Sequence, residues 1–175
     1  MTNKLSDKKN FPLGFTLIET LIYIAIFAIF IISMASFSNS LTASRLRHQM
    51  ILEVNDQGFS VIKTITQTIR DGNQINSPTI YNSANNLSIA TQQSATNPTV
   101  FSENNGVLYI TEGSNAPIAL TNSKVTASNL LFSNLSLPST PDIIKISFTL
   151  KSSSTSVIVS DAYSLNFSGS ANLRK

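Results

Sequence analysis

The feature that most constrains this chain is a long apolar run that contains one acidic residue. From residue 21 to residue 37 only three side chains carry a polar atom: Tyr23, Ser33 and Ser36. With residues 15–18, the run reaches the roughly 20 residues that a helix needs to span a bilayer. Glu19 lies inside this run. Because an ionised carboxylate is costly in hydrocarbon, Glu19 indicates a functional site that needs a cationic partner at the same depth.

The residues before the run are of a different kind. Three lysines make them basic: Lys4, Lys8 and Lys9. Pro12 lacks a backbone donor and biases Phe11 toward extended geometry, so a helix that begins in the run is not expected to continue into this segment. Gly14 has no side chain. A peptidase that binds an extended backbone in a narrow cleft would gain access from both features, the extended geometry near Pro12 and the missing side chain at Gly14. An ordinary flexible linker is the plainer interpretation of Pro12 and Gly14.

Taken together, these residues resemble the start of the type IV prepilin family, which includes the pilins of type IV pili and the pseudopilins of type II secretion and DNA uptake. In that family a short basic leader ends in Gly, a Phe follows, and a Glu lies four positions beyond that Phe. Gly14, Phe15 and Glu19 occupy these places here. The resemblance implies cleavage after Gly14 by a membrane-embedded prepilin peptidase, followed by methylation of the new amine on Phe15.

Such a cleavage would give Glu19 a candidate partner. The new α-amino group of Phe15 is a cation beside the apolar run, and it would face Glu19 of a neighbouring chain. A buried pair contributes little net stability, but loss of one partner leaves the other unpaired, so the pair serves register and orientation. A second interpretation, compatible with the first, is a carboxylate that is favoured by the helix macrodipole and extends toward the headgroups.

Two other kinds of N-terminal segment have a similar hydropathy. A secretory signal peptide has a basic start, but its apolar core of about 7 to 15 residues ends at a small-residue cleavage site. A plain signal anchor leaves Gly14 and Glu19 unexplained. For an anchor and a prepilin alike, the positive-inside rule keeps the basic start in the cytoplasm. We therefore expect a single-pass protein of the cytoplasmic (inner) membrane with an exported C-terminal domain, which reaches the periplasm or cell surface when assembled in a filament.

After the run the sequence keeps a helical pattern. Apolar or small residues recur at steps of three or four, as on one face of an α-helix: Ile51, Val54, Gly58, Ile62, Ile65 and Ile69. No proline interrupts residues 15–76. We therefore expect one helix from Phe15 to about Asp71, roughly 85 Å long at 1.5 Å per residue. Gly72 is expected in a helix-ending role.

From residue 73 onward the composition predicts β-strands and turns, because Asn, Ser and Thr surround short apolar segments. Residues 106–113 and 117–120 are expected to form a hairpin around Ser114 and Asn115. Residues 82–105 are expected to form a long loop region with one strand over residues 87–91.

Two further segments alternate between apolar and polar residues. Residues 144–150 do so cleanly, and residues 157–167 keep one parity except at Asp161. Residues 152–156 would be the polar turn between them. Such alternation indicates an antiparallel sheet with one buried face, and the helix stripe over residues 51–69 is the expected cover.

The predicted fold class is α+β. A long N-terminal α-helix, membrane-spanning in its first half, packs by its second half on an antiparallel β-sheet, and the resemblance makes this arrangement pilin-like. The expected organisation has four parts: a cleaved basic leader at 1–14, a transmembrane or filament-core helix at 15–37, its amphipathic continuation at 38–72, and an exported β-rich domain at 73–175.

Little in the sequence indicates catalysis. His48 is the one histidine and cysteine is absent, so neither a metal cluster nor a disulfide is expected. We predict no catalytic residues, no metal and no cofactor. The net charge is +3, and three lysines of the β-rich part are too few for a nucleic-acid-binding stripe: Lys124, Lys145 and Lys151.

The resemblance thus implies a structural subunit of a filament. Ser36 stands near the place where many pilins have a proline, which favours a minor pilin or pseudopilin. The implied partners are the prepilin peptidase, other pilin or pseudopilin subunits, an assembly-platform membrane protein and, before assembly, the lipid bilayer. Pilus, secretion pseudopilus and DNA-uptake machine stay open. The alternative function is a membrane-anchored surface binding or adhesion domain that does not polymerise.

Overall fold

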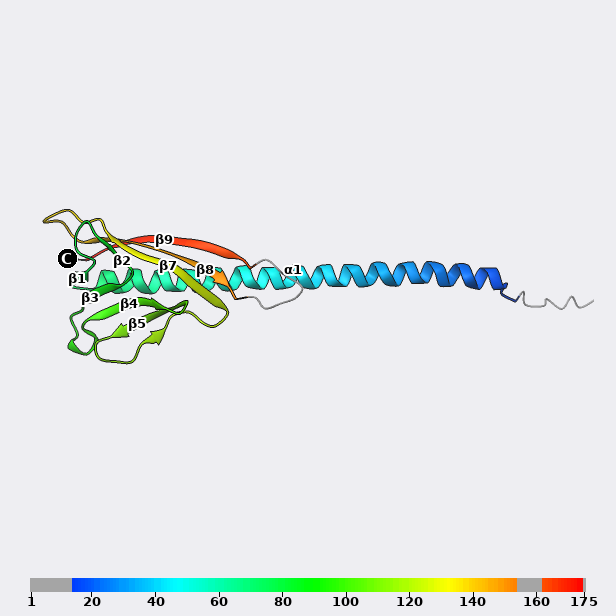
Figure 1. Ribbon diagram of the computed structural model, residues 1–175, viewed down its shortest axis with the longest axis horizontal. Coiled ribbons are helices and arrows are strands. Elements are labelled where there is room, and N and C mark those ends of the chain that lie inside the picture. The colour runs from blue at the N-terminus through cyan, green and yellow to red at the C-terminus, as the bar shows by residue number, and fades with distance from the viewer. Residues whose placement is uncertain (1–13, 154–161, 175) are drawn as a thin grey trace, which may run out of the picture. The chain divides into compact units, whose positions relative to one another are not determined.

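The computed structural model describes residues 14–153 and 162–174. One long helix, α1 (Leu17–Asp71), precedes nine strands that form two antiparallel sheets within these residues (Figure 1). The chain divides into two compact units, Met1–Thr42 and Ala43–Lys175. The α+β class and the end of the helix at Asp71 are therefore confirmed. The expectation of a single sheet is wrong, because the strands divide between two.

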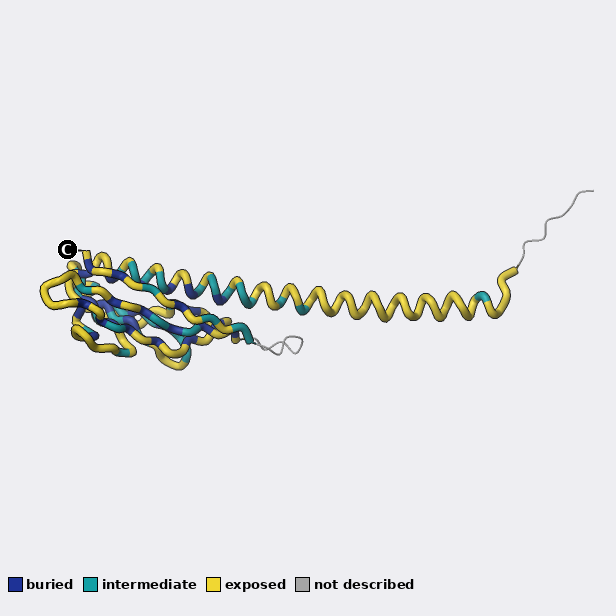
Figure 2. The backbone as a smooth tube through the Cα atoms, turned by 90° about the horizontal axis from the view of Figure 1, so that it is seen from above, coloured by how far each residue is buried: buried dark blue, intermediate teal, exposed yellow. Residues whose placement is uncertain are grey.

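In the first unit, α1 buries almost nothing. From residue 14 to residue 42 every residue is exposed except Glu19, which is half-buried. Figure 2 shows this part as yellow, interrupted by teal near the start of the helix. The most apolar stretch of α1 has a mean hydropathy of 2.4, and none of it is buried. By length and composition α1 could cross a membrane, a test that a signal sequence near an N-terminus also passes.

The two sheets take their strands from different parts of the chain. The first sheet has the order β1 (Gln74–Ser77), β3 (Leu87–Ala90), β4 (Thr99–Asn104), β5 (Val107–Glu112) and β6 (Ile118–Ala119). The second has the order β2 (Ser83–Ala84), β7 (Val125–Asn134), β8 (Ile143–Ser152) and β9 (Ser164–Asn172). A short 3-10 helix, Ser94–Thr96, precedes β4.

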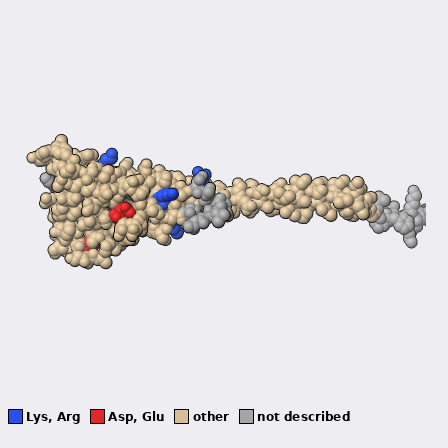
Figure 3. All heavy atoms as spheres, viewed as in Figure 1, with Lys and Arg blue, Asp and Glu red and all other residues tan. Residues whose placement is uncertain are grey.

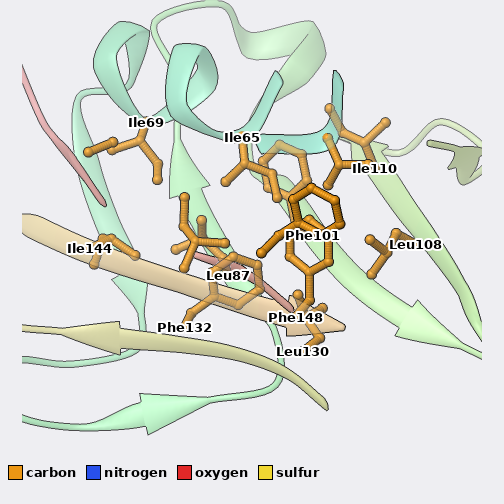
Figure 4. Packing of buried hydrophobic residues seen from close by; sticks show 14 of the residues in the cluster. Ile65, Ile69, Leu87, Phe101, Leu108, Ile110, Leu130, Phe132, Ile144 and Phe148 are labelled. Carbon is orange, nitrogen blue, oxygen red and sulfur yellow. The ribbon is translucent and has the colours of Figure 1, made fainter. Parts of the chain in front are cut away.

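One hydrophobic core joins the second part of α1 to both sheets (Figure 4). The largest fully buried side chains in it come from three strands: Phe101 of β4, Phe132 of β7 and Phe148 of β8. Full burial of such a side chain contributes about 1.5 to 3 kcal/mol. The core therefore fixes α1 from Val54 to Ile69 against the sheets, as the sequence predicts.

The buried face of α1 differs from the expected stripe at a few positions along its edges. Val61 is buried although the stripe omitted it, whereas Ile51 and Ile62 are only half-buried. The physical reason is the helical repeat of 3.6 residues per turn. Residues in the middle of one helix face are therefore spaced by three or four positions, with an average of 3.6. The buried positions follow that repeat: Val54, Gly58, Val61, Ile65 and Ile69.

Several predicted strands are present. The expected hairpin is formed by β5 and β6, where Tyr109 pairs with Ala119 and Ile110 with Ile118. In β8 the apolar side chains of the alternating segment are buried: Ile144, Ile146, Phe148 and Leu150. The second alternating segment is confirmed in β9, where Phe167 is buried. Its earlier part and most of the predicted polar turn fall on residues 154–161, outside the described residues.

The expectation of a long loop over residues 82–105 is wrong. The strand predicted at residues 87–91 corresponds to β3, but β2 and β4 also lie in this stretch. β4 pairs with β5 from Thr99↔Glu112 to Asn104↔Val107. Asn105 and Gly106 join them with φ values of 51° and 78°. Two positive φ values are typical of a type I′ hairpin turn, for which Asn-Gly is a preferred pair.

Gly72 follows α1 for a reason other than the expected one. Its φ lies outside the left-handed region that a glycine helix end usually adopts. A Cβ atom at this position would lie 2.5 Å from Cγ2 of Ile89 in β3. The glycine therefore allows the end of the helix to approach the first sheet closely.

Gly58 has the corresponding role against the second sheet. A Cβ atom there would lie 2.1 Å from Cζ of Phe167 in β9. The Phe167 ring stacks on Phe148 at a centroid distance of 5.4 Å and meets Phe59 edge-on at 5.8 Å. Because these neighbours hold the ring, an added methyl group at residue 58 would overpack this contact.

We predict that Gly58→Ala destabilises the protein, although alanine favours helix by about 1 kcal/mol over glycine. Overpacking costs about 1 to 3 kcal/mol, so a net loss of up to about 2 kcal/mol is expected. The free energy of unfolding of the full chain in detergent, from denaturant titration followed by circular dichroism, measures it. Ser60→Ala is the matched control, since Ser60 is exposed on the same helix. A Gly58→Ala protein as stable as the Ser60→Ala protein would contradict the packing argument.

Candidate functional site

The start of α1 is fixed by a side-chain cap that the sequence analysis missed. Oγ1 of Thr16 accepts a hydrogen bond from the backbone N–H of Glu19 at 3.3 Å. The carbonyl oxygen of Thr16 accepts from the N–H groups of Glu19 and Thr20 at 3.1 and 3.2 Å. Thr-x-x-Glu is the spacing of a capping box, so the motif was available in the sequence. The cap starts the helix directly after Gly14 and Phe15.

Two aromatic residues surround Glu19. The hydroxyl group of Tyr23 donates a hydrogen bond to Oε1 of Glu19 at 3.0 Å. The ring of Phe15 meets the ring of Tyr23 edge-on at a centroid distance of 6.2 Å. Glu19 and Tyr23 are four positions apart and share one face of α1. Phe15 lies before the helix and joins this row through its ring contact with Tyr23. Tyr23 thus contacts both predicted residues, Phe15 and Glu19, and is added to the site.

The hydroxyl groups of the apolar run are satisfied within the helix. Thr20, Ser33 and Ser36 donate to the backbone oxygens of Leu17, Ile29 and Ile32 at 2.8 to 3.0 Å. The Glu19 carboxylate differs from them, because its two oxygens have about four lone-pair sites. Among the described residues only Tyr23 occupies one of these sites. Glu19 therefore keeps acceptor capacity for a donor from outside this stretch of chain.

The peptide bond after Gly14 is accessible and lies before the helix. Gly14 is exposed, and no heavy atom lies within 4 Å of the place where its Cβ would be. Phe15 is 73% exposed. This peptide bond is therefore not part of the hydrogen-bonded turns of α1. The predicted basic leader and Pro12 fall on residues 1–13, which lie outside the described residues.

A second polar cluster joins α1 to the loop before β7. Oε1 of Glu53 accepts a hydrogen bond from Nδ2 of Asn122 at 2.7 Å, and Oε2 lies 3.4 Å from Nζ of Lys124. The Asn122 hydrogen bond holds the pKa of Glu53 below its ordinary value; partial burial opposes this shift, and the charge of Lys124 adds to it. The cluster borders an open groove of about 720 Å³. It is a structural clasp between α1 and this loop.

The remaining titratable residues do not gather into a site. His48 is exposed on α1. Within residues 14–153 and 162–174, no group of three or more His, Cys, Asp or Glu side chains could hold a metal ion. The site that the described geometry offers is therefore the row at the start of α1.

We predict that Asn122→Ala raises the pKa of Glu53, measurable by NMR titration of its side chain. Because the pKa of Glu53 is lowered in the folded state, the clasp stabilises the protein above the unfolded value of about 4.5, and this stabilisation is lost as the pH falls through the lower folded value. The stability difference between wild type and variant should be present at neutral pH and shrink in acid. Asn115→Ala, at an exposed turn, is the control. A stability difference that is constant with pH would contradict this assignment.

Comparison of the chain with protein-family models, with curated proteins and with solved structures finds no match. What the chain does is therefore inferred from its own residues and their geometry.

Proposed function

We propose that this chain is a structural subunit, a minor pilin or pseudopilin, of a type IV pilus-like filament or a type II secretion pseudopilus. It is processed by prepilin peptidase and assembled from the cytoplasmic membrane. One observation carries the proposal: Glu19 is the only charged side chain from residue 15 to residue 44, and it keeps open acceptor capacity on the first turn of a helix that begins just after Phe15.

The apolar half of α1 needs a non-aqueous partner. Its large side chains from Phe15 to Phe37 are at least half exposed on all sides of the helix. Soluble monomers rarely expose contiguous apolar patches of more than a few hundred Å². Lipid covers this surface first, and the same surface on other subunits replaces lipid when the chain assembles. Heterologous contacts of this kind give open helical filaments.

The proposed partner of Glu19 arises by cleavage. An α-amino group has an ordinary pKa near 8, so the amine of Phe15 carries a positive charge at neutral pH. In a neighbouring subunit this amine neutralises Glu19, and it does so at one axial offset between the helices. Loss of either charge leaves the other unpaired in an apolar environment, which is strongly unfavourable. The pair thus selects the stagger of subunits.

The second unit provides the part that stays outside the membrane. Its core of α1 and two sheets is independent of the apolar run, because the core residues all lie after residue 53. This supports an exported domain carried by the filament. The implied partners are the prepilin peptidase, other pilin or pseudopilin subunits and the assembly platform.

We predict that the mature protein begins at Phe15 and carries a methylated amine. Mass spectrometry of the N-terminal peptide, from the protein expressed in cells that contain a prepilin peptidase, measures this. Gly14→Val is the control variant, since a branched side chain at the cleavage site should leave the leader attached. An intact Met1, or a cut elsewhere, would contradict the proposal and favour the membrane-anchored binding domain.

We also predict that Glu19→Gln and Glu19→Ala leave membrane insertion intact and lower incorporation into filaments by more than about tenfold. Breaking a buried charge pair costs about 3 to 5 kcal/mol. Cell fractionation measures insertion, and immunoblots of sheared filaments measure incorporation. Ser33→Ala is the matched control, because its hydroxyl bonds only within the helix. Normal incorporation of Glu19→Gln would rule out the pairing.

A further inference from the structure

We propose that the second unit binds the headgroups of anionic phospholipids through a basic rim, defined as Arg45, Arg47, Lys124 and Lys151. This inference rests on the part of the proposed function that inserts residues 15–37 in a bilayer. It names anionic phospholipids as the ligand of the subunit before assembly, and the basic rim as the residues that bind them.

The four cations belong to one end of the second unit. The groove beside the Glu53 clasp is lined by Leu46, Lys124 and Ser152. Lys151 pairs across the sheet with Thr126, two positions after Lys124. Arg45 and Arg47 precede Glu53 on α1 by eight and six positions, about two helical turns. Figure 3 shows basic side chains near this end and also near the opposite end of the visible face, with acidic atoms between them and farther from this end.

The rim carries an excess of positive charge. All four of its residues are exposed. Lys124 pairs with Glu53, and that is the one ion pair within residues 14–153 and 162–174. Asp56 also lines the groove, so among the described residues two carboxylates, Glu53 and Asp56, face four cations.

At the opposite end of the second unit, the positive and negative charges around the groove balance. A second open groove near the end of α1 is lined by two cations and two carboxylates: Arg70, Arg174, Asp71 and Glu112. An anionic surface is therefore attracted to one end of the second unit and not to the other.

The position of the rim in the chain selects lipid as the anion. Arg45 follows Phe37 by eight positions, and the residues between them are uncharged and mostly polar: Ser38, Asn39, Ser40, Leu41, Thr42, Ala43 and Ser44. Eight helical residues rise about 12 Å, a few ångströms more than the headgroup layer of about 5 to 8 Å on each side of the hydrocarbon. Side chains on a helix lean toward its N-terminus, so long arginine side chains at these positions extend back toward that layer. Arginine binds phosphate in a bidentate manner. The arginines therefore reach the phosphate level when the apolar run fills the hydrocarbon.

The test uses the purified full chain in mixed micelles with equal amounts of phosphatidylglycerol and phosphatidylcholine of matched acyl chains. Lipids that stay bound after detergent removal are counted by mass spectrometry. Wild type should retain phosphatidylglycerol preferentially, and added salt should weaken the preference. The triple variant Arg45→Gln, Arg47→Gln, Lys151→Gln should lose at least about fivefold in the ratio of the two lipids, which corresponds to about one basic side chain near an anionic surface.

The control removes three exposed cations elsewhere in the unit: Lys63→Gln, Arg70→Gln and Lys145→Gln. It has the same net charge as the triple variant and should keep the wild-type ratio; the leader lysines are common to all variants. Equal retention of both lipids by wild type, or an equal loss in the control, would overturn the proposal. So would a triple variant that keeps the lipid ratio and loses only filament incorporation, which would assign the rim to a subunit contact.

This experiment fails separately from the proposed function. It needs neither leader cleavage nor polymerisation, so the Glu19→Gln protein should show the wild-type lipid ratio even where it does not assemble. A normal lipid ratio in a chain that is never cut after Gly14 would contradict the filament proposal alone.

Discussion

A carboxylate cannot stay ionised and unpaired in an apolar environment, and the start of this chain is organised around that constraint. The Tyr23 hydroxyl donates a hydrogen bond to one oxygen of the Glu19 carboxylate. The Thr16 side chain accepts a hydrogen bond from a backbone N–H in the first turn of the helix. The serine and threonine hydroxyls of the run bond to their own helix. Every other polar side chain of the run is therefore neutral and satisfied. What remains is one charge, and its partner must come from outside the run.

The two parts of α1 differ in the distribution of their apolar side chains. Residues 21–37 are apolar on all sides and exposed, whereas the part from Val54 to Ile69 is apolar on one face and buries that face. A helix that is apolar all round suits lipid or the centre of a bundle, and a one-sided helix suits the surface of a domain. Glycines at positions 58 and 72 let the sheets approach the second part closely. Stability of the domain and contact between apolar runs thus depend on different residues.

The sequence reveals those elements whose signals are local. Strand β8 was predicted because Ile144 to Leu150 alternate without a break, and β4 was missed although its turn, Asn105-Gly106, is a strong hairpin signal. Strand β7 was not predicted, because a bulge near Asn129 shifts its register with β8 and moves the buried side chains to the other parity. At the site, Glu19 and the Thr16 cap are readable from spacing. The Glu53–Asn122 contact joins residues 69 positions apart, so no local pattern encodes it.

The charges along α1 favour two different states of the subunit in the two proposals. Pairing of Glu19 with a neighbour's amine favours assembly, whereas contact of Arg45 and Arg47 with lipid headgroups favours the membrane-bound subunit. The first interaction forms only in the filament, and the second is lost when the run leaves the bilayer. Electrostatic attraction to an anionic surface is about 1 kcal/mol per cation, and loss of one partner of a buried pair costs more. Under the two proposals, the headgroup contact would be strong enough to hold the depth of an unassembled subunit and too weak to prevent its assembly.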